Sequence, residues 1–330
     1  STLSDMKAEK TRRKIGVDCR MYSSQFTGIG RYNHELVEHI VKFNNSQSEP
    51  CELVLFFNDP EFSKFKLPEN TRKVLTKARH YTFAEQTRFL RQLNKEKLDH
   101  MHFPHFNLPL LYNRPFTVTI HDLTLFYHPG KKMTNPLHRL AYHLVFRDAV
   151  KKAKQVITVS NHTKKDLLDK FSISESKVST IYNGISLQFK HNEHPAEIEK
   201  TLKKYQIKTP FLLYTGVWRD HKNLPRLIQA LKILREDKGL DLQLVITGKE
   251  DSNYPEVKQT VENLDLEDHI RFPGLVSEKE LAQLYNAAKI YVFPSLYEGF
   301  GLPPLESMRC GTPVAASNSS SIPEICEEAA

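Results

Sequence analysis

The second half of the chain alternates short apolar runs with helix-like stretches in a regular order. The apolar runs are Phe211–Thr215, Leu242–Thr247, Ile270–Phe272, Ile290–Pro294 and Thr312–Ala316. After the first run, Leu227, Leu231 and Leu234 lie at helical spacing, and Ser277-Glu-Lys-Glu280 is a capping box that opens a later helix. Strands that alternate with helices pair in parallel, so this pattern predicts a parallel sheet covered on both faces.

The first half repeats this pattern with longer connections. Strands are expected at Lys14–Cys19, Leu53–Phe57, His100–Phe103, Phe116–Ile120, Gln155–Val159 and Val178–Ile181, and helices at residues 30–43, 83–97, 136–153 and 161–170. The polar stretch Leu187–Thr209 is expected to connect two domains. The sequence therefore predicts an α/β fold of two doubly wound parallel-sheet domains, residues 1–190 and 191–330. Such sheets bind ligands beyond the carboxyl ends of their strands, so we expect the chemistry in loops that face a cleft between the domains.

The composition excludes several other classes of protein. With 39% apolar and 10% aromatic residues among 330, the chain is neither intrinsically disordered nor of low complexity. No window approaches the roughly 18 consecutive apolar residues of a membrane span. The basic N-terminus has no apolar centre of a signal peptide, so we expect a cytoplasmic protein. The four scattered cysteines form no CxxC pair, which argues against zinc or disulfides and predicts buried free thiols.

The net charge of +8 is unevenly divided along the chain. Residues 1–190 hold 31 basic and 18 acidic side chains, whereas residues 191–330 hold 16 and 21. A basic half joined to an acidic half predicts that the first half meets an anionic partner. Nucleic acid, a phospholipid surface and a phosphorylated substrate are all compatible with this charge.

The sharpest motif is the run Pro294-Ser-Leu-Tyr-Glu-Gly-Phe-Gly-Leu-Pro-Pro-Leu-Glu306. A strand leads into a loop with two glycines, and the two prolines suit the first turn of a helix. Gly299 and Gly301 let a ligand approach the backbone closely, while the amides of Phe300, Gly301 and Leu302 can point outward. Together with the helix dipole, these amides predict a site for a diphosphate.

Two glutamates flank this loop with seven residues between them. Glu298 precedes the expected diphosphate site, and Glu306 lies about one turn inside the following helix. Carboxylates accept hydrogen bonds from sugar and ribose hydroxyls, so the pair suits a ligand that carries them. Glu306 by itself is equally compatible with a structural role near the helix N-terminus.

A second motif, Tyr214-Thr-Gly216-Val-Trp-Arg219-Asp-His-Lys222, also follows a strand and precedes a helix. Arg219 and Lys222 are close enough in sequence to direct two cations at one diphosphate. An arginine presents a planar fork of donors and a lysine a compact point charge. Gly216 allows the backbone to approach the same ligand.

A third motif, Thr27-Gly28-Ile-Gly30-Arg-Tyr, follows the first strand and opens a helix. It is half of a dinucleotide fingerprint, but Asn33 occupies the third glycine position. The motif is therefore weak support for a nicotinamide cofactor, although Gly28 and Gly30 still permit close approach of a phosphate or sugar.

His121 comes directly after the strand Phe116–Ile120 and is expected to face the cleft. Glu85 ends the sequence Thr82-Phe-Ala-Glu85, which has the form of a capping box, so we expect a structural role for it. The chain contains no Asp-x-Asp, HExxH, Walker A or Gly-x-Ser-x-Gly sequence. We therefore expect no metal site, and no zincin, P-loop or α/β-hydrolase chemistry.

Taken together, the motifs resemble the retaining glycosyltransferases of family 4, which have the GT-B fold of two Rossmann-like domains facing a cleft. The segments that carry the resemblance are Glu298 to Glu306 as the Glu-x7-Glu motif, Gly299-Phe-Gly-Leu-Pro-Pro, Lys222-Asn-Leu, Ile181-Tyr-Asn-Gly184, His121-Asp122 and the Gly28/Gly30 loop. They extend over nearly the whole chain. Two features depart from the family: His221 stands before Lys222 where an arginine is frequent, and the chain ends at Ala330 before a further βα unit and a crossing helix. We therefore expect a truncated second domain with weaker interdomain closure.

The resemblance implies transfer of a hexose from GDP-mannose or a UDP-hexose to a glycan or lipid-linked acceptor, with retention and without a metal. It assigns charge stabilisation to Arg219, Lys222 and the amides of Gly299 to Leu302. Glu298 would hold sugar hydroxyls, Glu306 the ribose, and the amides of Gly274 to Val276 the base. His121 would contact the donor sugar, and Gly28, Gly30 and Gly216 would border the substrates.

Two other functions compete with this interpretation. A nucleotide-sugar epimerase or hydrolase could use the same scaffold, and a nucleic-acid-binding module would suit the basic charge but has no recognisable reader motif. The basic first domain instead predicts peripheral contact with the inner, anionic face of a membrane. The basic residues concerned are Lys131, Lys132, His138, Arg139, Arg147, Lys151, Lys152 and Lys154, with a second group at Arg72, Lys73, Lys77, Arg79, Arg88 and Arg91.

Overall fold

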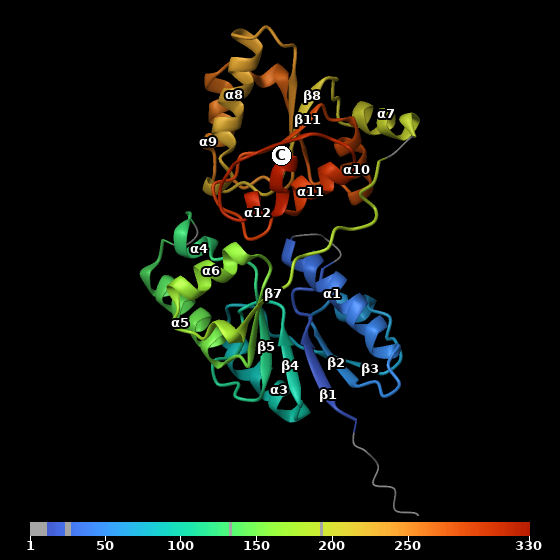
Figure 1. The fold of residues 1–330 in the computed structure, drawn as a ribbon, viewed down its shortest axis with the longest axis vertical. Helices are drawn as coiled ribbons and strands as arrows, with labels where there is room; N and C mark the ends of the chain where they lie inside the picture. Colours follow the sequence, from blue (N-terminus) through green and yellow to red (C-terminus); the bar gives the residue numbers. More distant parts are fainter. Residues whose placement is uncertain (1–11, 24–27, 132–133, 192–193) are drawn as a thin grey trace, which may run out of the picture. The chain divides into compact units, whose positions relative to one another are not determined.

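The computed structural model describes residues 12–23, 28–131, 134–191 and 194–330, which form two compact units. Unit 1 contains the chain up to His121 together with Leu137–Thr158 and Leu168–Thr180. Unit 2 contains Asp122–Pro136, Val159–Leu167 and Ile181–Ala330. Thr27 and Lys132, named above, lie outside the described residues. Figure 1 shows the ribbon coloured along the sequence.

Unit 1 is built on a sheet of seven parallel strands in the order β3-β2-β1-β4-β5-β6-β7 (Figure 1). The strands are β1 (Lys14–Asp18), β2 (Glu52–Phe57), β3 (Thr71–Leu75), β4 (His100–Phe103), β5 (Phe116–Ile120), β6 (Gln155–Thr158) and β7 (Val178–Thr180). Six of them match the expected strands to within one residue at either end. The sequence pattern missed β3 because this edge strand, Thr-Arg-Lys-Val-Leu, is half-buried throughout and carries polar side chains.

Several helices accompany this sheet along the chain. They are α1 (Gly28–Asn45), α2 (Glu61–Lys64), a π-helical turn η1 (Glu85–Phe89) that continues into α3 (Leu90–Glu96), α5 (Pro136–Lys152) and the 3-10 turn η2 (Glu175–Lys177). Helix α4 (Thr124–Tyr127) and most of α6 (Asn161–Lys170) belong to unit 2. Val37 and Val41 of α1 pack with Val17 and Leu53 of the two adjacent strands. The amphipathic spacing of α1 thus determines which face of the helix meets the sheet.

The expected capping box at Thr82–Glu85 is wrong. Thr82 donates its hydroxyl to Arg79 O instead of accepting a bond from the helix, and the Glu85 carboxylate accepts a hydrogen bond from Arg20. Leaving a buried guanidinium without a carboxylate costs more free energy than leaving an exposed helix end without a cap. The ion pair with Arg20 therefore determines where the Glu85 side chain points. Glu85 is nevertheless structural, as expected.

Unit 2 is built on five parallel strands in the order β10-β9-β8-β11-β12. The strands are β8 (Phe211–Thr215), β9 (Gln243–Thr247), β10 (Ile270–Gly274), β11 (Ile290–Phe293) and β12 (Val314–Ala316). The other elements are α7 (Pro195–Lys204), η3 (Asp220–Lys222), α8 (Leu224–Glu236), α9 (Glu256–Asn263), η4 (Glu267–His269), α10 (Glu278–Ala287), α11 (Leu302–Arg309), α12 (Ile322–Cys326) and η5 (Glu327–Ala329). All five strands were expected, and the Ser277–Glu280 capping box forms with both of its reciprocal bonds.

The stretch expected to connect the two domains, Leu187–Thr209, contains the helix α7, which the sequence pattern did not indicate. Thr201 on this helix hydrogen-bonds Gln283 of α10, and Leu202 packs on the core of unit 2. The helix buries little apolar surface, which explains why its sequence reads as polar. Lys204 adds an ion pair with Glu280 at 2.5 Å.

The core of unit 2 lies along its central strands. Leu213 and Tyr214 of β8, Val245 of β9 and Tyr291 of β11 are completely buried. Cys310 and Cys326 are buried free thiols here, as Cys19 is in unit 1, whereas Cys51 is half-buried. None of the helices in the described part of the chain combines the length and apolarity that crossing a membrane requires.

Candidate functional site

The switch point of the unit 2 sheet lies between β8 and β11, which pair although β9 follows β8 along the chain. The loop after β8 ends at Lys222, and the loop after β11 carries Glu298. Both loops leave adjacent strands at the same edge of the sheet, where α/β folds bind their ligands. There, Lys222 Nζ lies 2.6 Å from Glu298 Oε1.

This ion pair is largely shielded from water. The Lys222 side chain is 16% exposed and the Glu298 side chain 14%. The ammonium also lies 5.8 Å from the centroid of the Phe293 ring. Opposite charges attract more strongly in such a partly dry place than at the surface, so each side chain holds the other in position. The pair presents an acceptor-only carboxylate beside an ammonium with three donors.

Glu298 leads directly into the glycine loop. Gly301 is the N-cap of α11 with φ +110°, a conformation that residues with a side chain rarely adopt. The two prolines after Leu302 have no N–H group, so the first turn of α11 has few donors to satisfy. Within the described chain, the amides of Phe300, Gly301 and Leu302 have no hydrogen-bond acceptor. The loop therefore offers open backbone donors at a helix N-terminus.

Hydroxyl groups hold this loop from its other side. Ser320 Oγ accepts a bond from the Glu298 amide at 2.8 Å, and Ser321 Oγ lies 2.9 Å from the carbonyl oxygens of both Glu298 and Phe300. Ser160, which belongs to the same unit, donates to Gly299 O at 2.7 Å. These contacts fix the loop backbone without using its open amides.

Arg219 points to the other side of β8. Its Nη1 donates to Asp251 Oδ2 at 2.6 Å, and its guanidinium lies 5.5 Å from the centroid of the Tyr254 ring. Asp251 follows β9, whereas the carboxylate partner of Lys222 follows β11, and these two strands flank β8. The two cations expected to share one diphosphate are thus paired with separate carboxylates. A contact between Arg219 and a diphosphate stays a prediction.

His221 lies between these two cations in sequence. Burial, reinforced by the Lys222 charge, lowers the pKa of His221 to about 3, so the imidazole is neutral near pH 7. Its ring lies 6.0 Å from that of His128 in the same unit. The positive charge of the loop is therefore carried by Arg219 and Lys222 alone.

Three glycines bring the ends of β8, β9 and β10 close together. Gly216 donates its amide to Thr247 O at 3.0 Å, and Gly248 donates to Gly274 O at 2.8 Å. A Cβ atom at Gly248 would lie only 2.3 Å from Gly216 O, so a larger residue there requires a backbone shift. Val276 is half-buried against the core beside this edge. That the amides of Gly274 to Val276 meet a base stays a prediction.

Glu306 lies deeper than the other carboxylate of the motif. It is 2% exposed, and the Tyr285 hydroxyl donates to its Oε2 at 3.1 Å. Tyr285 is itself completely buried in α10. The contact ties α11 to α10, which is the structural role that the sequence left open for Glu306. Its expected contact with a ribose stays a prediction.

In unit 1, His121 follows β5 and is held in a defined orientation. Its Nε2 lies 2.8 Å from Pro104 O, a geometry that requires Nε2 to carry the proton. The Tyr32 ring of α1 packs edge-on against the imidazole with centroids 4.6 Å apart, and the Tyr32 hydroxyl bonds Thr119. A tautomer and a ring plane are thus imposed on His121 by neighbours in its own unit.

Gly28 and Gly30 are the first and third residues of α1. Asn33, at the place of the third fingerprint glycine, is buried and donates its side-chain amide to Asp18 O at 2.9 Å. This bond ties α1 to the end of β1, which explains why an asparagine stands there. Contact of Gly28 and Gly30 with a substrate stays a prediction.

The end of β1 carries a buried charge cluster that the sequence did not indicate. Arg20 donates Nε and Nη2 to the two carboxylate oxygens of Asp18 at 2.9 and 2.8 Å, and Nη1 to Glu85 Oε2 at 2.8 Å. The guanidinium also covers the Phe89 ring at 3.9 Å. The Arg20 side chain is fully buried and those of both carboxylates nearly so. With a further bond from Nη2 to Asn107 O at 3.1 Å, the guanidinium makes four hydrogen bonds within unit 1, which indicates a structural clamp.

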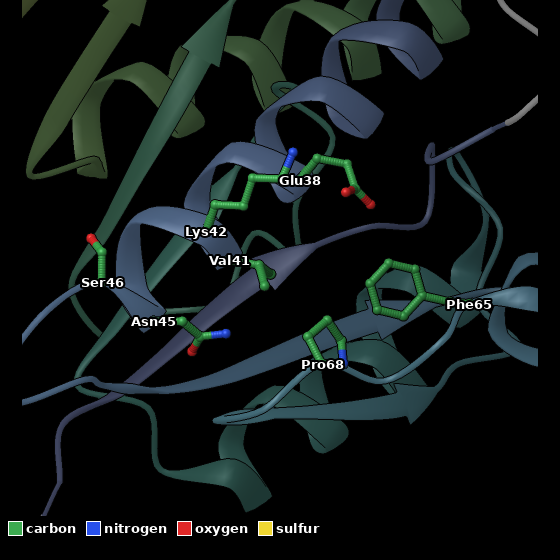
Figure 2. Close-up of a pocket in the computed structure, with 7 residues that line it drawn as sticks. All are labelled: Glu38, Val41, Lys42, Asn45, Ser46, Phe65 and Pro68. Carbon is green, nitrogen blue, oxygen red and sulfur yellow. The ribbon is translucent and has the colours of Figure 1, made fainter.

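Unit 1 contains cavities beside α1 and beyond the ends of β2 and β3. One of about 550 Å³ is formed by α1 and the segment before β3; Figure 2 shows Glu38, Val41, Lys42 and Asn45 on the helix facing Phe65. Phe65 packs on Phe57 at the carboxyl end of β2, whereas Asn45 ends α1 before the start of β2, so the cavity runs along α1 and does not lie at one edge of the sheet. Two others, of about 340 and 600 Å³, lie beyond the carboxyl ends of β2 and β3.

Among residues 12–23, 28–131, 134–191 and 194–330, no three histidine, cysteine, aspartate or glutamate side chains come together as metal ligands. Sequence reasoning missed Asp251, Gly248 and the Ser320-Ser321 pair. Only Gly248, directly after an expected strand, carried a signal that could have been found. Asp251 and the serines acquire their roles from loops that are distant in sequence.

Residues 26–189 match the family described as Glycosyltransferase Family 4, and residues 197–330 match Glycosyl transferases group 1. The chain is 31% identical to O-antigen chain mannosyltransferase B of Escherichia coli, over 92% of this chain and 82% of that protein. It is 30% identical to O-antigen chain mannosyltransferase RfbU of Salmonella typhimurium, over 65% of this chain and about half (54%) of that protein.

Several solved structures share the architecture. Sucrose-phosphate synthase from Thermosynechococcus elongatus superposes with a TM-score of 0.73 at 19% identity, over 94% of this chain and 82% of that one. WaaG, a glycosyltransferase involved in lipopolysaccharide biosynthesis, superposes with a TM-score of 0.70 at 16% identity, over 95% and 84%. At such identities the likeness concerns the fold, and it confirms the expected class of two parallel-sheet α/β domains.

Proposed function

The chain belongs to the group 1, family 4 glycosyltransferases, and from that premise we propose that it is a retaining, metal-independent hexosyltransferase. Its donor is a nucleoside-diphosphate sugar and its acceptor a glycan, free or lipid-linked. Both similar proteins named above are mannosyltransferases of O-antigen chains, so GDP-mannose is the first donor to test and a UDP-hexose the second. Synthesis of a polysaccharide is the corresponding cellular role.

The observation that carries this proposal is the contact between Lys222 and Glu298 beside open backbone amides. In a nucleotide sugar, the anomeric carbon joins a phosphate to a ring with hydroxyl groups. An ammonium 2.6 Å from a carboxylate matches that junction, because the cation suits the phosphate and the carboxylate accepts from the hydroxyls. The amides of Phe300, Gly301 and Leu302 then bind the diphosphate oxygens at the N-terminus of α11.

The chemical step requires stabilisation of a leaving group. Breaking the bond between the anomeric carbon and oxygen leaves positive charge on the sugar and negative charge on the diphosphate. Lys222 and the loop amides are held in place before the reaction, and such preorganised donors are usually the largest contribution to catalysis. Arg219 contributes by sharing its guanidinium between Asp251 and the diphosphate. With these cations supplying the charge, the step runs without a divalent metal.

Retention follows if the acceptor hydroxyl attacks on the face from which the diphosphate leaves. The departing phosphate oxygen then takes the proton of that hydroxyl, and no carboxylate nucleophile is needed. Glycosidases that retain configuration instead place two carboxylates about 5–5.5 Å apart on opposite faces of the sugar. His121, with Nε2 bonded to Pro104 O, is assigned to the donor sugar, and Glu306 to the ribose.

The partners on the acceptor side follow from charge. The first domain carries the basic excess of the chain, and we assign it to an anionic membrane surface that bears the acceptor. The protein then acts at the inner face of the membrane from the cytoplasm.

Donor binding and product analysis test the proposal. Thermal shifts of the purified chain are measured with GDP-mannose, UDP-glucose, GDP and UDP, each with EDTA present. We expect one donor and its nucleoside diphosphate to raise the melting temperature. Transfer to a mannose-terminated oligosaccharide is then expected to persist in EDTA and to yield the α-linked product of an α-linked donor. Hydrolysis or epimerisation with donor alone as the main outcome, or transfer that EDTA abolishes, would overturn it.

A further inference from the structure

Helix α5 exposes apolar side chains along the side that does not face its sheet. Leu137 is 73% exposed, Leu140 57% and Leu144 41%, and Ala141 between them is also exposed. In a water-facing position, a helix of this length ordinarily carries polar residues. Exposed leucines so close together therefore mark an interaction surface.

The three leucines share one face because of their spacing. Positions three, four and seven apart lie on the same side of an α-helix, and Leu137, Leu140 and Leu144 have these separations. The buried residues Tyr142, Phe146, Ala149 and Val150 occupy the opposite side and pack toward the sheet. Helix α5 thus has two apolar faces, of which its own unit covers only one. We call the outer face, made of Leu137, Leu140 and Leu144, the leucine face.

Positive charge continues the leucine face toward the end of α5 through Arg147 and Lys151. Within α5, Arg139, Arg147, Lys151 and Lys152 are exposed cations, and Asp148 is the only acidic residue. Asp148 forms an ion pair with Lys152 at 3.0 Å, whereas Arg139, Arg147 and Lys151 form no ion pair with any described residue. Apolar side chains flanked by arginines and lysines are typical of helices that lie in the interface of an anionic bilayer.

A second exposed apolar segment belongs to the same unit. Tyr81 is 64% exposed and Phe83 82%, on the loop before η1. The Tyr81 ring lies 6.3 Å from Phe106, whose ring lies 5.1 Å from Tyr142 of α5. Aromatic side chains of this kind favour the headgroup region of membranes. Phe106 thus connects the loop to the sheet-facing side of α5, and the loop is an apolar segment separate from the leucine face.

From these observations we infer that α5 docks on an anionic lipid bilayer by inserting the leucine face between the headgroups, while Arg147 and Lys151 pair with lipid phosphates. We favour a bilayer over a second copy of this chain as the partner of the leucine face, because two copies of α5 would bring their positively charged side chains close together. The inference rests on the membrane partner proposed above but not on the transfer reaction. Beyond the membrane contact proposed above, the inference states that apolar insertion contributes to binding and that α5 makes the contact.

Vesicle flotation tests the inference. Purified protein is mixed with phosphatidylcholine vesicles that contain about 30 mol % phosphatidylglycerol, and bound protein is measured at low salt and at about 0.5 M NaCl. We expect binding to weaken with salt but to persist in part, because apolar insertion is not screened. The triple variant Leu137→Ser/Leu140→Ser/Leu144→Ser is expected to bind at least about tenfold less at both salt concentrations.

The matched control removes three leucines of similar exposure elsewhere. Leu67, Leu187 and Leu240 are 52%, 77% and 46% exposed, so Leu67→Ser/Leu187→Ser/Leu240→Ser is expected to float like the unaltered chain. Circular dichroism melting verifies that both variants fold. Donor-induced thermal shifts of the leucine-face variant are expected to stay unchanged, which separates failure of docking from failure of the transferase proposal.

Three results would overturn the inference. They are no flotation of the unaltered chain at low salt, equal flotation of the two triple variants, and complete loss of binding at high salt, which would indicate adhesion by charge alone. Light scattering of the same samples identifies the competing occupant: a dimer that the leucine-face variant converts to a monomer would assign this face to a second copy of the chain.

Discussion

The two sheets share a strand order but use their carboxyl edges differently. In each, the first strand lies inside the sheet between the second and the fourth, so that β1 pairs with β4 in unit 1 and β8 with β11 in unit 2. At that edge, unit 2 has the Lys222–Glu298 pair, which is 16% and 14% exposed beside open amides. Unit 1 has the Asp18–Arg20–Glu85 cluster, whose side chains are between 0% and 6% exposed.

This difference shows that topology provides a place for a ligand but not its chemistry. The Arg20 guanidinium donates its hydrogen bonds to residues of its own unit. Burial raises the pKa of Glu85, although the positive charge of Arg20 acts in the opposite direction. Lys222 has one carboxylate partner and remains accessible. The same edge therefore carries a clamp in unit 1 and the proposed donor site in unit 2.

The strongest test of this comparison removes the charges of the unit 2 site. Lys222→Ala and Glu298→Gln are each expected to lower kcat/KM for transfer by about 10²–10³-fold, because each removes a preorganised group beside the reacting bond. Steady-state kinetics with the preferred donor measures the effect. The control is Lys258→Ala, which removes an exposed lysine paired with Glu250, and we expect near-normal turnover from it. Full activity of either site variant would show that the pair does not contact the donor.

A second test compares one arginine from each unit. Arg20→Met leaves Asp18 and Glu85 buried without their cation, so we expect a loss of about 3–5 kcal/mol in the free energy of unfolding. Arg219→Met acts on a pair whose arginine is 27% exposed, and we expect about 1 kcal/mol or less. Urea denaturation measures both. The comparison fails if the two variants lose equal stability, or if Arg20→Met impairs transfer in protein that is still folded.

A third test concerns the strand-end glycines of unit 2. Gly248→Ala places a Cβ 2.3 Å from Gly216 O, at φ +119°, so the β8 and β9 loops must separate. We expect about 1–3 kcal/mol of destabilisation and weaker donor binding. Gly184→Ala is the control, since nothing lies within 4 Å of a Cβ there. Thermal melts with and without donor compare them, and an unchanged melt for Gly248→Ala would mean that the loops tolerate the added atom.

Much of the fold could be predicted from the sequence because apolar periodicity is local. All strands of unit 2 and six of the seven in unit 1 follow from runs of apolar residues. The exceptions, β3 and α7, bury few apolar side chains: β3 lies at a sheet edge, and α7 rests on the core through residues such as Leu202. Where little apolar surface is buried, the pattern that indicates an element is weak.

The candidate site was predictable only in part, for a related reason. Lys222, Glu298 and Gly301 stand in motifs whose residues are consecutive, and these can be found by inspection. Asp251 takes its place because β9 is the neighbour of β8, and Ser321 because the chain after β12 turns back to Glu298. Glu85 shows the opposite case, in which a local motif was outweighed by a partner 65 residues away.

The sequence alone determined the α/β class, the glycine loop with its two glutamates and the division of charge between the halves, because each depends on neighbouring residues or on composition. The tertiary structure decided which charges are available. Pairing β8 with β11 places Lys222 against Glu298, whereas folding η1 onto β1 buries Arg20 between two carboxylates. A charged side chain in a sequence has no burial and no partner of its own. Both are set by the segments that the sheet brings beside it, and they determine whether that charge can bind a ligand.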